Sequence, residues 1–166
     1  VEYFVQAVDP AGNVALALDH GVPFRVNATL PPGQTRVTLL PNSAGTLTFT
    51  DGNGNPTQVS APADAVTVTT TLLYTSLPSA NPAGQQLMFA GHAFTLDGYQ
   101  NGVFIGGLTF QKPVTVSITY SDTDVAGIDE TSLQLFTWDG SQWVDAATTC
   151  SPPSTYTRDL TDHVLS

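Results

Sequence analysis

Charged residues are scarce in this sequence, and almost none of them are basic. Four Lys and Arg stand against 14 Asp and Glu in 166 residues, a formal net charge of −10 with neutral His. Phosphate contacts require clustered Arg and Lys, so this balance argues against a nucleic-acid partner and against anionic membrane surfaces. We interpret the acidity mainly as a source of solubility through self-repulsion, ahead of a role in holding divalent cations.

Cysteine pairs, long apolar runs and helical periodicity are missing too. The single Cys150 has no Cys or His partner at zinc-binding spacing, which argues against a structural zinc. No run of 18 apolar residues occurs, so no membrane insertion is predicted. No segment carries an apolar stripe at helical spacing over three turns, and only residues 129–132 indicate one helical turn.

What the chain does contain is Thr, Ser, Asn and Gln alternating with apolar residues, as in β-strands. Residues 46–50 alternate cleanly and stop at a Gly- and Asn-rich turn, and residues 65–74 form a long Val/Thr-rich segment. Further strands are expected at residues 35–40, 86–90, 92–96, 108–110, 113–120, 133–138, 142–145 and 156–160. We therefore predict an all-β fold, an antiparallel β-sandwich with an N-terminal β-hairpin and almost no helix.

The first 22 residues read as a β-hairpin. Residues 1–8 alternate, residues 9–13 (Asp-Pro-Ala-Gly-Asn) have turn chemistry, and residues 14–18 form the return strand. This hairpin resembles the last two strands of a fibronectin type III or immunoglobulin-like domain, with Tyr3 near the tyrosine-corner position. An isolated hairpin is marginal in water, so we expect it to pair with a following sheet edge or with another copy, unfolding being the alternative.

Residues 45–145 carry an ordered succession of motifs. They are Gly91-His-Ala-Phe-Thr-Leu96, Phe110-Gln-Lys-Pro-Val-Thr115, Ile128-Asp-Glu-Thr-Ser-Leu133 and Trp138-Asp-Gly-Ser-Gln-Trp143. The succession resembles the ZU-type β-sandwich domain of ankyrins and netrin receptors, in the form common in bacterial surface proteins. The resemblance implies an interaction or spacer module. The expected domain plan is an immunoglobulin-like hairpin at residues 1–22, a connector at 23–44 and a ZU-like sandwich at 45–166, truncated at its C-terminal end.

Two acidic stretches are candidate calcium sites. The loop after residue 120 places four carboxylates close together, which could supply the hard oxygen ligands that calcium prefers: Asp122, Asp124, Asp129 and Glu130. Turn chemistry and a capped helical turn explain the same residues, and we favour that interpretation. Asp51, Asn53 and Asn55 resemble the start of a calcium loop, but Pro56 and Pro62 stand where such a loop needs Gly and Glu, so a hairpin turn is favoured.

No catalytic residue is predicted, and we expect that the chain is not an enzyme. His20, His92 and His163 stand in three separate segments without a catalytic motif. Some ZU-type relatives cut their own chain at His-Phe-Ser; here His163 and Ser166 are one residue too far apart, so self-cleavage is not expected.

Two further features carry weaker expectations. Cys150 would form a disulfide to a residue outside residues 1–166, or else stay a buried free thiol. Trp138, Trp143 and Tyr156 could form an aromatic platform for sugars, although cross-strand packing of the two tryptophans is favoured.

These observations predict a non-catalytic structural or adhesive module of a large secreted or cell-surface protein. Its expected partners are neighbouring domains of the same chain and, through the N-terminal hairpin or a sheet edge, other copies. A carbohydrate-binding module and a calcium-stiffened linker are the alternatives, and no cofactor other than calcium is considered.

Overall fold

The structure is a computed structural model that describes residues 2–3, 5–8, 10–11, 14–17, 24–25, 29–79 and 87–166. The chain separates into two compact units, Val1–Pro31 and Pro32–Ser166. Every strand pairing described is antiparallel, and the only helical elements among these residues are two short 3-10 turns, so the predicted all-β fold is confirmed. No helix in the described ranges is long and apolar enough to cross a membrane.

The first unit is built from two short strand pairs. β1 (Glu2–Tyr3) pairs with β4 (Phe24–Arg25), and β2 (Val5–Val8) pairs with β3 (Val14–Ala17). The β2–β3 pair confirms the predicted N-terminal hairpin, with exposed Val8 opposite exposed Val14. The side chain of Tyr3 and the whole of His20 lie outside the part that the structure describes.

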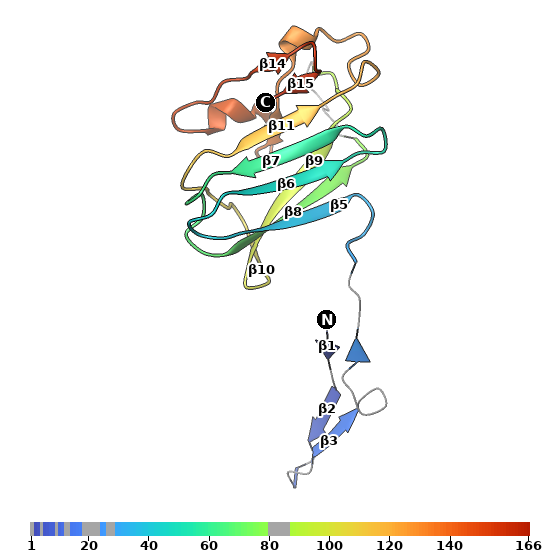
Figure 1. Cartoon of the computed structure of the whole chain (residues 1–166), viewed down its shortest axis with the longest axis vertical. Coiled ribbons are helices and arrows are strands. Elements are labelled where there is room, and N and C mark those ends of the chain that lie inside the picture. The colour runs from blue at the N-terminus through green and yellow to red at the C-terminus, as the bar shows by residue number, and fades with distance from the viewer. Residues whose placement is uncertain are drawn as a thin grey trace. The chain divides into compact units, whose positions relative to one another are not determined.

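The second unit is a β-sandwich of two sheets (Figure 1). The four-stranded sheet has the order β10-β9-β8-β5, with β5 (Gln34–Leu39), β8 (Thr70–Leu77), β9 (Ala93–Gln100) and β10 (Val103–Ile105). The five-stranded sheet has the order β14-β15-β11-β7-β6, with β6 (Gly45–Thr50), β7 (Pro56–Ala61), β11 (Thr115–Thr119), β14 (Arg158–Asp159) and β15 (Val164–Leu165).

Smaller elements follow β11 along the chain. The turn η1 (Glu130–Ser132) confirms the single predicted helical turn, and Asp129 caps it by accepting the Thr131 N–H. β12 (Phe136–Trp138) and β13 (Trp143–Asp145) form the predicted Asp-Gly hairpin, and η2 (Ala146–Thr149) comes next.

The sandwich core lies between inward-facing rows of both sheets. Leu72 and Tyr74 of β8 face Leu47 of β6 and Val59 of β7, and all four side chains are almost fully buried. Phe49, Tyr74 and Phe94 stack in succession, with ring centroids 4.7 and 4.9 Å apart. A second, smaller cluster lies apart from this core, and its buried members are Tyr120, Val125, Leu133 and Leu165.

Several predicted boundaries differ from the structure. The compact second unit begins at Pro32, because β5 lies within the predicted connector 23–44 and buries Leu39 in the core. Residues 65–69 are not part of a strand, since Ala65 and Val66 enter the core from a loop instead. Residues 87–90 and 108–110 are also not strands, whereas the three-residue strand β10 was not predicted.

Candidate functional site

The acidic loop, residues 121–130, lies between β11 and η1 and is held down by two contacts around Asp124. The Oδ2 atom of Asp124 accepts hydrogen bonds from the Ser121 backbone N–H at 2.8 Å and from the Ser121 hydroxyl at 2.6 Å. The same oxygen lies 3.6 Å from Nε2 of His92. Asp124 also covers Gly91, where an added Cβ would lie 2.7 Å from the carboxyl carbon. The loop is therefore packed against the segment that leads into β9.

His163 meets the same loop from the other sheet. Its Nδ1 lies 3.5 Å from Oε2 of Glu130, an oxygen that also accepts a 3.0 Å hydrogen bond from the Tyr120 hydroxyl. Its Nε2 lies 3.7 Å from the exposed Asp122 carboxylate. Burial, together with the hydrogen bond to Glu130, raises the pKa of Tyr120 to about 12. Two histidines from distant parts of the sequence thus converge on one loop.

The four candidate calcium ligands do not gather into a metal-binding group among the described residues. Asp124 is bonded to Ser121, Asp129 accepts from the backbone N–H and hydroxyl of Thr131, and Glu130 accepts from Tyr120. Nowhere in the described ranges do three or more His, Cys, Asp or Glu side chains gather as metal ligands. Asp51 accepts the backbone N–H groups of Asn53 and Asn55, both at 2.8 Å, which confirms the hairpin turn there.

The aromatic candidates divide into the Trp138–Trp143 pair and the partly buried Tyr156. Trp138 and Trp143 are directly opposite each other in the β12–β13 hairpin, with ring centroids 5.6 Å apart at 64°, so the favoured packing is confirmed. The Tyr156 hydroxyl lies instead beneath this hairpin, 2.6 Å from Oδ1 of Asp145 and 2.9 Å from the Leu135 carbonyl. Burial and the Asp145 hydrogen bond raise the pKa of Tyr156 to about 12. The three rings therefore do not form one platform.

Arg158 fixes the start of the same hairpin. Its Nε and one terminal nitrogen both donate to the Leu133 carbonyl, at 2.9 and 2.6 Å, and its guanidinium lies 5.3 Å from the Tyr156 ring centroid. Together, Tyr156 and Arg158 tie the β12–β13 hairpin to the strand pair at the C-terminal end.

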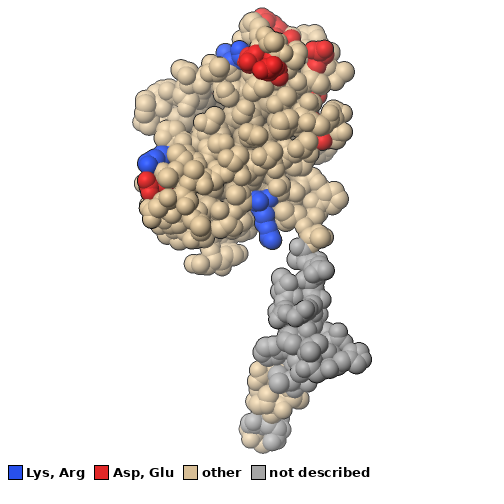
Figure 2. All heavy atoms as spheres, viewed as in Figure 1, with Lys and Arg blue, Asp and Glu red and all other residues tan. Residues whose placement is uncertain are grey.

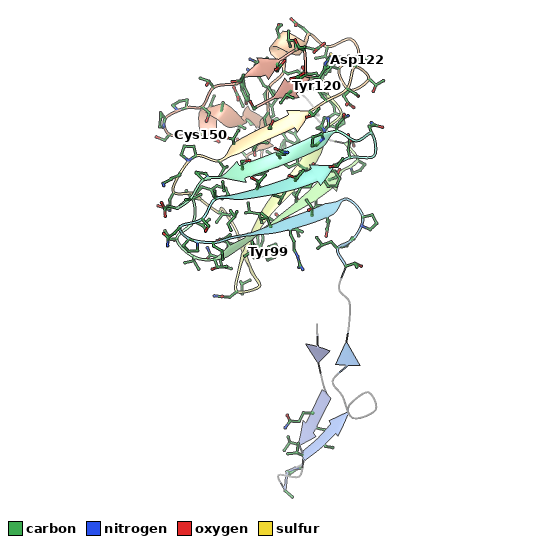
Figure 3. All side chains as sticks on the ribbon, viewed as in Figure 1. Tyr99, Tyr120, Asp122 and Cys150 are labelled. Carbon is green, nitrogen blue, oxygen red and sulfur yellow. The ribbon has the colours of Figure 1, made fainter. Side chains whose placement is uncertain are left out.

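The remaining candidates occupy separate places. Cys150 is a free, exposed thiol directly after η2, so the alternative of a buried thiol is wrong. Its labelled position in Figure 3 is well separated from Tyr99. Ser166 exchanges two backbone hydrogen bonds with Thr157, at 2.7 and 3.0 Å, which extends the β14–β15 pairing.

The β9–β10 hairpin is the surface that sequence reasoning missed. Asn101 and Gly102 both have positive φ, 51° and 77°, as a two-residue type I′ turn requires. The turn's closing hydrogen bond joins Gln100 and Val103. Because hydrogen-bonded and non-hydrogen-bonded pairs alternate along an antiparallel ladder, the next pair, Tyr99 and Phe104, is non-hydrogen-bonded. The backbone N–H and C=O of Phe104 therefore point away from β9, along the outer edge of the sheet.

Side chains around this edge are apolar and accessible. Val103 is 64% exposed and Phe104 is 56% exposed, and the Phe104 ring packs edge-on against Tyr99 at 5.8 Å. Leu108 folds back over Gly98, where an added Cβ would lie 2.7 Å from a Leu108 methyl carbon. Beside it runs a groove of about 330 Å³. Its lining is mostly apolar, with Leu96, Phe104, Ile105, Leu108 and Phe110, but also includes the charged Asp97.

The charged residues lie mainly elsewhere. On the face shown in Figure 2, Asp and Glu gather at the end that carries β14 and β15, whereas the end that carries β10 is nearly free of them. Figure 3 places Tyr99 at one end of the sandwich and Tyr120 and Asp122 at the other. The structure thus offers an acidic end and an open edge on which Asp97 is the charged residue that lines the adjoining groove.

Comparison with known proteins identified no relative of this chain. A scan against protein-family models and searches of curated proteins and of solved structures each returned no match. The immunoglobulin-like and ZU-type resemblances stay predictions, and the candidate site rests on the geometry of the described residues.

Asp124 gives a testable pH dependence. Burial raises its pKa, but the hydrogen bonds from Ser121 and the neighbouring His92 outweigh that effect and leave it below the ordinary value. A carboxyl with a lowered folded-state pKa stabilises the fold above its unfolded-state pKa, and this contribution is lost as the pH falls through the folded-state pKa. Asp124→Asn is therefore expected to lower the free energy of unfolding at pH 7 by about 1.5–3 kcal/mol. The variant should also lose less stability than the wild type as the pH falls.

Chemical denaturation at pH values between 7 and 3 measures this effect. Asp122→Asn is the matched control, because the Asp122 side chain is 89% exposed, and its stability should follow the wild-type profile. Parallel profiles for wild type and Asp124→Asn would show that the Ser121 and His92 contacts do not stabilise the loop.

Proposed function

We propose that this chain is a non-catalytic structural or adhesive module of a larger secreted or cell-surface protein, and that it binds other proteins through the β10 edge. The observation that carries the proposal is the open edge itself. β10 ends its sheet with Val103 and Phe104 exposed and with the backbone hydrogen-bonding groups of Phe104 directed outward. Such an edge is a template for pairing with another strand.

The composition of the edge supports a binding role. Natural proteins usually protect exposed edges with charged residues, proline or a bulge. Residues 98–110 contain no charged residue, no histidine and no proline. The adjoining groove can accept apolar side chains from a strand added to β10, while backbone hydrogen bonds supply the remaining affinity. An unprotected edge next to an apolar groove favours recognition over simple spacing.

The extracellular setting is supported by composition and resemblance. The sandwich surface relies on neutral Thr, Ser, Asn and Gln, and only 11% of the residues are charged. The motif order of residues 45–145 resembles ZU-type modules, and residues 1–22 resemble the closing hairpin of an immunoglobulin-like module. In this proposal, the neighbouring domains of the same chain are additional partners, and the sandwich also spaces them.

An adhesion assay tests the proposal. Beads coated with the wild-type chain are expected to bind to cells that display the parent protein, and Phe104→Lys is expected to abolish most of that binding by placing a charge on the edge. Leu40→Lys is the matched control, since Leu40 is 50% exposed at a different place and its loss should leave binding unchanged.

The folded state of each variant is checked by far-ultraviolet circular dichroism before the assay. Wild-type beads that bind no better than uncoated beads would refute the proposed function. Phe104→Lys beads that bind as well as wild-type beads would show that the β10 edge is not the binding surface.

A further inference from the structure

We propose that the strand bound by the β10 edge belongs to a second copy of this chain, paired antiparallel about a two-fold axis that passes through Phe104. This inference rests on the proposed function and names its partner. Three observations support it: the geometry of the edge backbone, the apolar side chains beside it and the distribution of charge.

The backbone of β10 is self-complementary. Phe104 lies at the middle of the three-residue strand Val103–Ile105, and it is the residue whose N–H and C=O both point outward. In a two-fold antiparallel arrangement, each Phe104 donates its N–H to the carbonyl of the other and accepts in return. Val103 of each copy then lies opposite Ile105 of the other. No shift of either strand is needed to satisfy both outward groups.

The side chains gain from the same arrangement. Val103 and Phe104 expose more than half of their surface in a single copy. The axis brings the two Phe104 rings together as a cross-strand pair, each already packed against its own Tyr99. Gly106 and Gly107 follow the strand, so no bulky side chain stands at either end of the new contact. The two four-stranded sheets then continue as one sheet across both copies.

The distribution of charged residues favours this edge for contact between two copies. Each chain carries a formal charge of −10, so copies repel each other through most of their surface. Residues 98–110 are uncharged, and the acidic loop lies at the opposite end of the sandwich (Figures 2 and 3). Pairing through β10 keeps the acidic ends apart. Asp97 is the one charged residue among those that line the adjoining groove, so a partner selected by charge would find few opposite charges to pair with there. Association between like-charged copies is also expected to strengthen with added salt.

Disulfide trapping tests the pairing and its register. In a Cys150→Ser background, which removes the only native thiol, a mixture of Val103→Cys and Ile105→Cys chains places the two thiols opposite each other and keeps both Phe104 rings. Residues 103 and 105 of the two copies form a non-hydrogen-bonded pair, whose Cα atoms lie about 4.5 Å apart, within disulfide range. The Val103→Cys chain alone is the control: the two residues 103 are offset along the strands and lie about 8–9 Å apart, too far to bridge.

We expect the mixture of Val103→Cys and Ile105→Cys chains to form crosslinked dimer about tenfold faster than the Val103→Cys chain alone under mild oxidation. Random collision would give the reverse order, because Val103 is exposed whereas Ile105 is partly buried. Equal or reversed rates would overturn the inference.

Sedimentation equilibrium of the wild-type chain provides the second measurement. A three-residue contact is small, so a dissociation constant of about 0.1–1 mM is expected, with a monomeric Phe104→Lys variant. A wild-type chain that stays monomeric throughout this range overturns the inference. If bead binding to cells still depends on Phe104 in that case, the proposed function stands and the edge takes a strand from a different protein.

Discussion

Replacement of Tyr74 by alanine is expected to lower the free energy of unfolding by about 3–5 kcal/mol. Tyr74 of β8 is 2% exposed. Its ring lies between the ring of Phe49, in β6 of the opposite sheet, and the ring of Phe94, in the neighbouring strand β9, and both ring centroids are less than 5 Å away. Truncation would leave a cavity at the point where the two sheets meet, and neither neighbouring ring can fill it without leaving its own contacts. Denaturant unfolding, followed by tyrosine circular dichroism, measures the loss.

Tyr74→Phe separates packing from hydrogen bonding. Burial raises the pKa of Tyr74, and its side-chain hydrogen bond with Thr57 acts in the opposite direction. Because Thr57 is itself buried, removal of the hydroxyl leaves a polar group without this partner and should cost about 1–2 kcal/mol. Tyr74→Phe also gives a measurable change in the free energy of unfolding if Tyr74→Ala does not fold. A loss below about 1 kcal/mol for Tyr74→Ala would contradict the central role given to the stack.

Replacement of Gly91 by alanine is the second large effect, expected at about 2–4 kcal/mol. Gly91 has a φ of +77°, which costs any residue with a Cβ, and the added carbon would displace Asp124 from its bonds to Ser121. Gly102→Ala is the control, because Gly102 has the same φ of +77° and no atom within 4 Å of the added carbon.

The difference between the two variants isolates the contact with Asp124 from the backbone cost. Gly102→Ala should lose only about 1–2 kcal/mol. Equal losses in thermal or denaturant unfolding would show that Asp124 moves aside freely and that the acidic loop is not held by this contact.

The architecture could be predicted from local patterns because each of its longer strands carries its own alternation. Residues 46–50, whose Leu47 faces the core, are one example, and the Asp139-Gly140 turn of the β12–β13 hairpin is another. Residues 65–69 were placed in a strand because Val and Thr favour β-structure, but burial of Ala65 and Val66 from a loop overrode that propensity.

The candidate site was harder to predict for two physical reasons. β10 is only three residues long and is followed by two glycines, so it shows no alternation; the Asn101-Gly102 pair was the one signal that could have located the hairpin. The convergence of His92 and His163 on the acidic loop depends on tertiary packing between segments far apart in the sequence, which periodicity does not report.

The division of the buried side chains into two clusters has a consequence for local opening. The cluster around Tyr120 and Leu165 is small, and the adjoining β12–β13 hairpin pairs only with itself and depends on the Tyr156 and Arg158 anchors. The amides of this hairpin can exchange with solvent, and its loops can be cut by a protease, while the two large sheets stay packed together. We therefore expect the β12–β13 hairpin and its loops to open without disturbing β10, which lies in the four-stranded sheet.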